Sequence, residues 1–360
     1  MGRSPELREW ISSIDTHTGG EPTRNVLSGV PRLPGETMIE KARYFSEHFD
    51  TLRQRLLFEP RGNEVMSGTL LTAPCRAEAD VGVVFIEVGG YLPMCGHDTI
   101  GLCTALVEAK KVRVHEPETC IVLDTPAGLV RVTVFVQAGH ATAVCFRGVP
   151  SFVVQANLRV PMPSGATVTG DLAYGGNLYF SVDAAQLGLT ITNDAVGDLV
   201  RTGIELRETI NRQVAVDHPA LPYTDCVTHV QFTAPPRSSG ATAGNAVIIP
   251  PGAVDRSACG TGTAARMAIL HAQGSLPIGE SFVHEGPLGT TMNGVIVECV
   301  DIRGTAAIIP EISGRAFVTG YHRFVSNADD PLDHGFLLGR GDEPFLCTME
   351  RERRREEEIR

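Results

Sequence analysis

The sequence predicts an α/β protein with two strand-rich domains, each built around one buried helix. Short runs rich in Val and Ile recur between Gly, Pro and Asp residues, which is typical of strands. Two segments, 99–109 and 262–272, are apolar on nearly every side, and a helix without a polar face belongs inside a core. The chain has 360 residues, of which 42% are hydrophobic, and this is enough for about two such cores.

The remaining elements follow from the spacing of apolar residues. Strands are expected at 80–88, 120–125, 129–136, 141–149, 245–250, 293–300, 306–310 and 315–321. Two further helices, 38–57 and 191–213, have amphipathic spacing, so each should cover a sheet with its apolar face. We therefore expect a first domain over 1–135 completed by 315–348, a second domain over 136–314, and a charged tail over 349–360.

The charge balance excludes several classes of partner. The 31 Lys and Arg residues against 42 Asp and Glu residues give a net charge of −11, which disfavours binding to nucleic acid or to an anionic membrane surface. The sequence contains no run of 18 or more apolar residues, so we expect no segment that spans a bilayer. The first residues lack the apolar stretch of a secretory signal, so we expect a cytoplasmic protein that acts on a small molecule.

Nine cysteines are present, without a CxxC pair or a Cys/His cluster of zinc-site spacing, and we expect no metal. Most should be small buried side chains. Four of them lie in apolar or alternating runs that fit this expectation: Cys103, Cys145, Cys226 and Cys299. Cys95 and Cys259 do not fit it, because each directly precedes one of the apolar helices.

A short repeat surrounds these two cysteines. MCGHDTIG (94–101) and ACGTGTAA (258–265) each contain Cys-Gly, with Thr four residues after the Cys. The N-terminus of a helix presents unpaired N–H groups and a partial positive charge, so it binds anions and lowers the pKa of a thiol. The sequence therefore predicts two thiols at equivalent helix starts, with a small carboxylate held between them.

Two such thiols suit a two-base proton transfer. One thiolate would remove the proton from a stereogenic carbon, and the opposite thiol would deliver one to the other face. N–H dipoles would stabilise the charge that grows on the carboxylate. A Cys–His hydrolase would leave the second cysteine without a role, and a redox pair would favour CxxC spacing. Neither a metal nor a pyridoxal cofactor is required.

The same segments resemble the signature motifs of the proline racemase family. Further segments are similar to family landmarks: IDTHTGGEPTR (14–24), FEPRG (58–62), GGYLPMCGH (89–97), YGGN (174–177) and DDPLDHGFLL (329–338). The resemblance implies the diaminopimelate epimerase-like fold, with two pseudo-symmetric domains, a site in the cleft between them, and a homodimer. It also implies cofactor-independent inversion at Cα of a cyclic imino acid.

The resemblance also assigns roles to individual residues. Cys95 and Cys259 would be the acid/base pair. The N–H groups of four residues would hold the carboxylate: Gly96, His97, Gly260 and Thr261. His97 and Asp255 would contact the ring nitrogen.

Two positions depart from the family pattern. Ala258 stands where Pro usually precedes the second cysteine, which should loosen the approach loop slightly. Asp98 stands where Gly or Asn is frequent, and we expect its side chain to face outward, interacting with the helix start.

The substrate is predicted from the ring end of the pocket. Family members that resemble trans-3-hydroxyproline dehydratases have Thr in place of the second cysteine, so Cys259 argues against dehydration. Ser67, His229 and Ile249 align with positions that are apolar in proline racemases, and Ser and His donors suit a ring hydroxyl. This favours 4-hydroxyproline 2-epimerase. Proline racemase remains the first alternative activity, because AAQLGL (184–189) is more similar to proline racemases. A 3-hydroxyproline epimerase or dehydratase is the next alternative.

Two other classes also remain open. The segment from Gly260 to Ala265 matches G-x-G-x-x-A, the fingerprint of dinucleotide-binding oxidoreductases. Against this, eight residues separate Pro250 from Cys259, and we expect no βαβ alternation around the segment. A non-catalytic imino-acid binding protein on the same fold is disfavoured because both thiols are retained.

Overall fold

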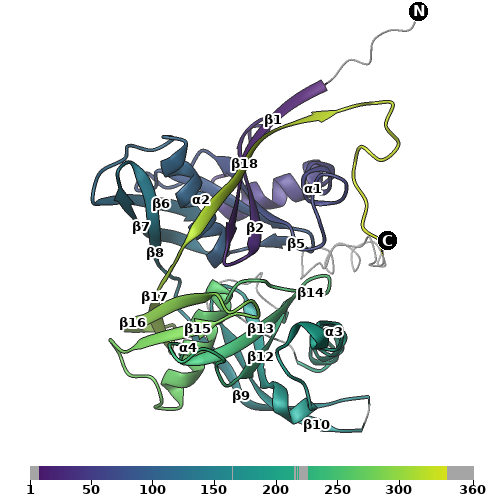
Figure 1. Cartoon of the computed structure of the whole chain (residues 1–360), viewed down its shortest axis with the longest axis vertical. Coiled ribbons are helices and arrows are strands. Elements are labelled where there is room, and N and C mark those ends of the chain that lie inside the picture. The colour runs from purple at the N-terminus through teal and green to yellow at the C-terminus, as the bar shows by residue number, and fades with distance from the viewer. Residues whose placement is uncertain (1–7, 164, 215, 217, 219–225, 339–360) are drawn as a thin grey trace, which may run out of the picture. The chain divides into compact units, whose positions relative to one another are not determined.

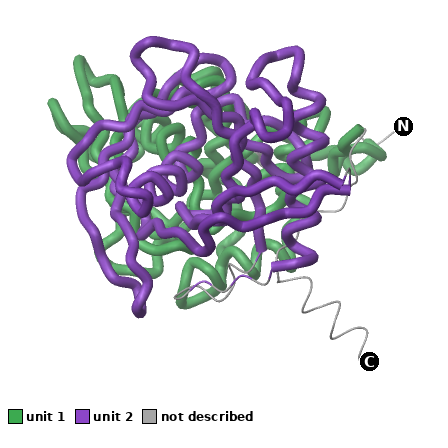
Figure 2. Tube along the Cα trace, turned by 90° about the horizontal axis from the view of Figure 1, so that it is seen from below, with its two compact units in different colours: residues 1–146, 315–343 green, residues 147–314, 344–360 purple. Residues whose placement is uncertain are grey.

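The computed structural model describes residues 8–163, 165–214, 216, 218 and 226–338. The predicted tail over 349–360 lies outside these residues, as does Cys347. Contacts divide the chain into two compact units, coloured separately in Figure 2. Among the described residues, the first unit takes those up to Phe146 and those from Arg315 onward, and the second takes Arg147–Gly314. No helix in the described part of the chain is long and apolar enough to cross a membrane.

Figure 1 labels many of the elements of each unit. The first unit contains β1 (Arg8–Thr18), β2 (Glu21–Ser28), α1 (Met38–Leu57), β3 (Ser67–Thr72), β4 (Val81–Glu87), β5 (Gly90–Leu92), α2 (Gly96–Glu108), β6 (Glu118–Thr125), β7 (Gly128–Gln137), β8 (His140–Arg147, ending at the boundary) and β18 (Ala316–Ser326). The second contains β9 (Phe152–Pro161), β10 (Thr167–Tyr174), β11 (Leu178–Asp183), the 3-10 helices η1 (Ala184–Leu187) and η2 (Asn193–Ala195), α3 (Val196–Gln213), β12 (His229–Ala234), β13 (Ala243–Ile249), β14 (Ala253–Val254), α4 (Gly260–Ala272), β15 (Ser281–Glu285), β16 (Thr291–Ile302) and β17 (Thr305–Gly314).

The two units repeat one topology. In the first, β2 and β3 pair in parallel across α1, β3 and β4 are antiparallel, and β4 and β6 pair in parallel across α2. In the second, β11 and β12 pair in parallel across α3, β12 and β13 are antiparallel, and β13 and β15 pair in parallel across α4. The predicted pseudo-symmetry is therefore present in the order and direction of the strands.

Each unit wraps its strands around the predicted apolar helix. Every residue of α2 from Gly96 to Val107 is buried, and α2 contacts β1, β2 and β18. In α4 the first six residues, from Gly260 to Ala265, are all buried, and the helix contacts β9, β10, β16 and β17. The two helices begin at Gly96 and Gly260, two or three residues before their predicted starts, so that each begins directly after its cysteine.

The amphipathic helices occupy the equivalent outer positions. α1 has the predicted bounds, and a capping box between Thr37 and Glu40 fixes its start. Its apolar face supplies Phe45 and Leu56 to a core that also contains Ile86 of β4. The predicted helix over 191–213 begins as α helix only at Val196, because Asn193–Ala195 form a 3-10 turn.

Three of the sequence landmarks contribute residues to structural ion pairs. Asp15 and Arg24 face each other on β1 and β2 in a buried pair with an Oδ2–Nη2 distance of 2.8 Å. Arg61 of FEPRG binds Asp333 of DDPLDHGFLL with an Nη2–Oδ1 distance of 2.8 Å. The first pair joins adjacent strands, and the second joins segments 272 positions apart in the chain. Both explain the landmarks by folding rather than by chemistry.

Candidate active site

Cys95 and Cys259 both occupy the N-cap position of a buried helix, as the repeat predicted. They are 4% and 5% exposed. The first hydrogen bond within each helix comes from Thr99 N–H to Cys95 O at 3.1 Å and from Thr263 N–H to Cys259 O at 2.7 Å. The N–H groups of the three residues that follow each cysteine therefore have no partner inside their helix, so each cysteine lies beside a potential anion site.

The backbones of the two cysteines differ. Cys95 is extended, with φ −135° and ψ 124°. Cys259 has φ 60° and ψ 100°, a backbone conformation that residues other than glycine rarely adopt. Such strained conformations are often found at functional sites. Gly262 makes room for this arrangement, because a Cβ there would lie 3.0 Å from the Cys259 sulfur.

A network of buried polar side chains surrounds Cys95. His97 lies with Nδ1 3.3 Å from the Cys95 sulfur and Nε2 2.8 Å from Ser67 Oγ and 3.1 Å from Asp98 Oδ1. The same carboxylate oxygen accepts hydrogen bonds from Ser67 at 2.6 Å and Thr23 at 2.7 Å. Asp98 is fully buried, so the expectation that it faces outward was wrong: the hydroxyls of β2 and β3 compensate its charge on the inner side.

This network shifts the ionisation of its members. Burial, followed by the charge of Asp98, raises the pKa of the Cys95 thiol to about 12, although His97 opposes the shift. Burial disfavours the imidazolium of His97, but Cys95 and Asp98 outweigh it and raise the pKa of His97 well above its usual value. Burial also opposes ionisation of Asp98, but His97, Ser67 and Thr23 lower its pKa. These directions favour the charged forms of Asp98 and His97, whose side chains form a buried pair beside Cys95.

Cys95, His97 and Asp98 also place three possible metal-binding atoms within 4.8 Å of one another. The hydrogen bonds among these side chains account for that closeness, and we assign no metal to them. No other such group occurs in the described part of the chain.

Hydroxyl groups surround Cys259. The Tyr179 hydroxyl lies 3.4 Å from the Cys259 sulfur and 2.6 Å from Thr261 Oγ1. The ring of Tyr179 packs on the ring of His229, with their centroids 4.8 Å apart. His229 is buried, and its Nδ1 lies 2.6 Å from Thr228 Oγ1. Tyr179 thus connects three of the predicted site residues of the second unit.

Asp255 shapes the loop that leads to Cys259. Its carboxylate accepts a hydrogen bond from Ser257 N–H at 2.7 Å, and Ser257 Oγ accepts one from Cys259 N–H at 2.9 Å. Asp255 is 2% exposed. The loop therefore holds Cys259 at the helix start through two successive side-chain-to-backbone bonds.

The structure brings Ser67, His97 and Cys95 together in the first unit, and His229, Thr261 and Cys259 together in the second. Thr23 and Tyr179 complete the two sets, and neither was identified from the sequence. They occupy equivalent register positions, because Thr23 pairs with Ser67 and Tyr179 pairs with His229. The sequence carries a signal for them: TGGEPT (18–23) and YGGNLY (174–179) align through their Gly-Gly pairs.

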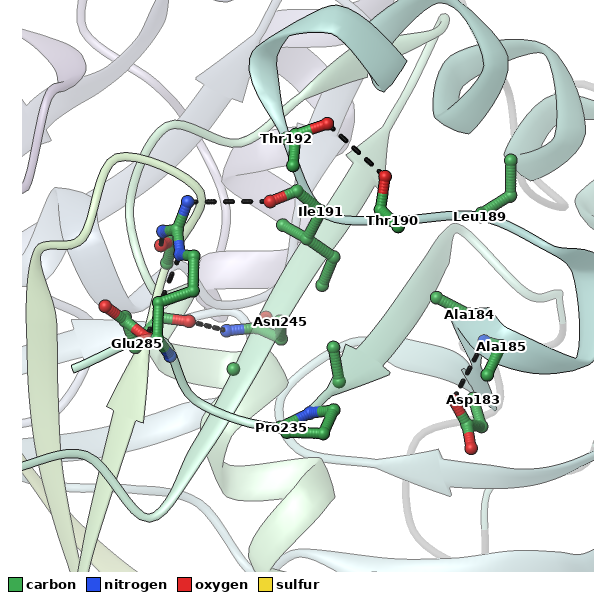
Figure 3. A pocket seen from close by; sticks show the side chains of 14 residues that line it. Asp183, Ala184, Ala185, Leu189, Thr190, Ile191, Thr192, Pro235, Asn245 and Glu285 are labelled. Carbon is green, nitrogen blue, oxygen red and sulfur yellow. Dashed lines mark hydrogen bonds and ion pairs between the residues drawn. The ribbon is translucent and has the colours of Figure 1, made fainter. Parts of the chain in front are cut away.

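A cavity of about 320 Å³ opens elsewhere in the second unit (Figure 3). Glu285 and Asn245 lie on one side of it and Asp183 lies on the other. None of the predicted site residues lines this cavity. The AAQLGL segment contributes to its wall, so the similarity of that segment to proline racemases carries no information about the predicted pocket.

The four cysteines that were predicted to be buried fit that prediction in part. Cys103 and Cys226 are buried and Cys145 is half-buried. Cys299 is exposed, contrary to the prediction, because the register of β16 shifts between Ile296 and Glu298 and the inward alternation is lost beyond that point.

The dinucleotide fingerprint falls at the start of α4. This helix does connect two parallel strands, β13 and β15, so the expectation that no βαβ unit surrounds it was wrong. However, ten residues separate Ile249 from Gly260, and β14 turns back along β13 within them. The strand does not pass directly into the helix, as a dinucleotide-binding turn requires.

Comparison with known proteins decides the family. A family model described as proline racemase matches residues 13–337. The chain belongs to the proline racemase family. It is 43% identical over 328 residues to the proline racemase of Clostridioides difficile, covering 91% of this chain and 98% of that protein. It is 45% identical over 326 residues to the 4-hydroxyproline 2-epimerase of Streptosporangium roseum, with the same two coverages of 91% and 98%.

Solved structures of the family confirm the fold. A hydroxyproline epimerase from Agrobacterium vitis with bound trans-4-hydroxy-L-proline superposes with a TM-score of 0.88 at 34% identity, covering 93% of this chain and 96% of that one. The predicted diaminopimelate epimerase-like α/β fold is therefore confirmed. The racemases and epimerases of the proline racemase family are isomerases.

Proposed function

We propose that the protein is a cofactor-independent epimerase that inverts Cα of a cyclic imino acid, and that it acts on 4-hydroxyproline. The observation that carries the proposal is the pair of buried thiols, each at the N-cap of a buried helix and each in the same place of a repeated unit. A single reactive cysteine would need neither the repeat nor the second helix start.

In the proposed reaction one cysteine acts as a thiolate and the other as a thiol. The thiolate takes the proton from Cα, and the electron pair of the broken C–H bond moves toward the carboxylate. The thiol then gives its proton to the opposite face of Cα and becomes the thiolate. Atoms and charges balance without a metal, a pyridoxal group or a redox partner.

The helix starts would hold the substrate carboxylate. Free N–H groups of Gly96 and His97 in one unit, and of Gly260 and Thr261 in the other, would donate to it. They would bind more strongly as negative charge grows on the carboxylate, which stabilises the transition state. His97 and Asp255 would lie at the ring nitrogen. The Asp255 carboxylate would favour the cationic secondary amine, and Asp98 would balance the charge of His97.

The choice of 4-hydroxyproline depends on Ser67 and His229. These residues occupy equivalent positions at the starts of β3 and β12, each next to the set around a cysteine. Their polar groups suit a ring hydroxyl, which an apolar pocket would leave without a partner. The 4-hydroxyproline 2-epimerase among the relatives and the hydroxyproline bound to the Agrobacterium vitis epimerase support this choice.

Proline racemase is the second candidate, since a proline racemase is similar to the chain to nearly the same degree. Cytoplasmic location and a homodimer stay predictions.

Incubation in deuterated water with three imino acids in parallel tests the proposal. The substrates are trans-4-hydroxy-L-proline, L-proline and trans-3-hydroxy-L-proline. We expect the fastest reaction with the first, giving cis-4-hydroxy-D-proline with deuterium at Cα. Faster turnover of L-proline would make the protein a proline racemase, and loss of water from the 3-hydroxy compound would make it a dehydratase. Binding of all three without exchange at Cα would overturn the enzymatic proposal.

A further inference from the structure

The two thiols of the repeated units have different neighbours. The third residue after the cysteine is Asp98 in the first unit and Gly262 in the second. At the equivalent strand positions, Thr23 donates to Asp98, whereas the Tyr179 hydroxyl lies 3.4 Å from the Cys259 sulfur. A carboxylate therefore lies near one thiol, and a hydroxyl group lies near the other.

The hydrogen bonds that reach Cys259 can all run in one direction, toward its sulfur. The amide nitrogen of Asn177 can only donate, and it lies 3.4 Å from Thr261 Oγ1. Thr261 then accepts from Asn177 and is able to give its own proton to Tyr179, whose oxygen is 2.6 Å away. In this arrangement the Tyr179 hydroxyl donates to the Cys259 sulfur, which lies 3.4 Å away. Successive donors of this kind polarise one another and favour negative charge at the end of the chain.

The YGGN landmark (174–177) holds this chain of donors in place. Gly175 lies against the first turn of α4: a Cβ there would be 2.2 Å from Thr261 O and 2.5 Å from Ala265 N. No side chain fits at this contact, so the landmark fixes the distance between Asn177 and Thr261.

We propose that Tyr179 is a positioning residue that holds Cys259 as the thiolate, so that Cys259 takes the first proton from the substrate while Cys95 begins as the thiol. This inference rests on the proposed function. Tyr179 keeps its own proton throughout and only donates a hydrogen bond. When the Cα–H bond breaks, the proton goes to the Cys259 sulfur, the electron pair goes to Cα and the carboxylate, and Cys95 protonates the opposite face. The high pKa of Cys95 described above is consistent with this order.

The other ionisable groups near Cys259 in the second unit have described contacts of their own. His229 packs on the Tyr179 ring, and Asp255 accepts from the backbone of the approach loop. His284 of β15 lies 2.9 Å from Thr263 Oγ1, and burial, together with Arg266, lowers the pKa of His284 to about 3, so it is neutral. All of these groups remain in the variants below.

Alkylation of individual cysteines tests the proposal. The full-length protein is treated with iodoacetamide between about pH 5 and pH 10, digested with trypsin and analysed by mass spectrometry. Cys259 is the only cysteine in the tryptic peptide 257–266, and fragmentation separates Cys95 from Cys103 in the peptide 77–110. We expect Cys259 to titrate at a lower pH than Cys95. Tyr179→Phe should raise the Cys259 midpoint by on the order of one pH unit, which slows its alkylation about tenfold near neutral pH.

Tyr174→Phe is the matched control. Tyr174 is fully buried in the same landmark, and its hydroxyl has no hydrogen-bond partner among the described residues. The Tyr174→Phe substitution should leave the midpoint of the Cys259 alkylation profile unchanged. The proposal is overturned by an unchanged or lower midpoint in Tyr179→Phe, by an equal shift in Tyr174→Phe, or by titration of Cys95 before Cys259. These readouts are independent of turnover, so failure of all imino acids to exchange at Cα would refute the proposed function separately.

Discussion

Replacement of Asp98 by Asn removes one buried charge and leaves the size of the side chain unchanged. The carboxylate accepts two short hydrogen bonds, from Ser67 and Thr23, and pairs with His97. Each charge-assisted bond should lose about 1 kcal/mol when its acceptor becomes neutral. Asp98 Oδ2 is buried without a hydrogen-bond partner among the described residues, so an amide nitrogen there would cost about 1–3 kcal/mol more. Relief of the buried charge offsets part of this, and we expect a loss of about 2–4 kcal/mol in the free energy of unfolding.

The loss should depend on pH in a defined direction. The pKa of His97 is raised in the folded state, so its stabilising contribution is complete below its unfolded pKa of about 6.5 and disappears as pH rises through the folded value. The pKa of Asp98 is lowered, so its contribution is present above its unfolded pKa of about 4 and disappears as pH falls through the folded value. The difference between Asp98→Asn and the parent should therefore be largest near about pH 5.5.

Urea unfolding followed by circular dichroism at about pH 3, 5.5 and 9 measures this difference. Thr23→Val is the control, because it removes one donor to Asp98 and leaves the ion pair with His97 in place. It should destabilise the protein less and retain the parent's pH dependence. A loss below about 1 kcal/mol for Asp98→Asn, or a loss that is equal at the three pH values, would refute the ion pair and its buried environment.

Other changes give equally definite expectations. Gly175→Ala should lower the activity and reduce the free energy of unfolding by about 2 kcal/mol or more, because the added Cβ meets the backbone of α4. Gly197→Ala should leave the stability unchanged or raise it, because no neighbouring atom lies within 4 Å of the added Cβ. Differential scanning calorimetry compares the unfolding temperatures of the two variants. Ser67→Ala should lower kcat/KM for 4-hydroxyproline more than for proline, and equal losses would exclude Ser67 from recognition of the hydroxyl. Pyrrole-2-carboxylate, a planar mimic of the carbanion, should protect Cys95 and Cys259 from alkylation without protecting the exposed Cys299.

The sequence predicted the features that depend on local pattern. The bounds of α1 follow from its amphipathic spacing and its capping box, and the burial of α2 and α4 follows from helices with no polar face. The strands β1 and β2 were not predicted, because their inward positions carry Asp15, Arg24 and other polar side chains that satisfy one another across the sheet. Such pairs conceal the alternation that identifies a half-buried strand.

The surroundings of the thiols depend on residues far away in the chain. Asp98 was expected to face outward from the dipole of its own helix, but its partners Ser67 and Thr23 lie 31 and 75 positions away in sequence. Tyr179 lies 80 positions from Cys259, and only the alignment of the two Gly-Gly segments points to it. The local sequence pattern was enough to identify the two cysteines. The residues that surround them became evident only from the repeated topology of the two units.

The position of solvent deuterium at early conversion tests inversion by two thiols most directly. The protein is mixed with one epimer in deuterated water, and both epimers are analysed after a few per cent of reaction. Two thiols on opposite faces should yield a product with deuterium at Cα, while the unreacted epimer keeps its original hydrogen. Deuterium appearing equally fast in the unreacted epimer, or a product that carries the substrate's own hydrogen, would show that a single group serves both faces.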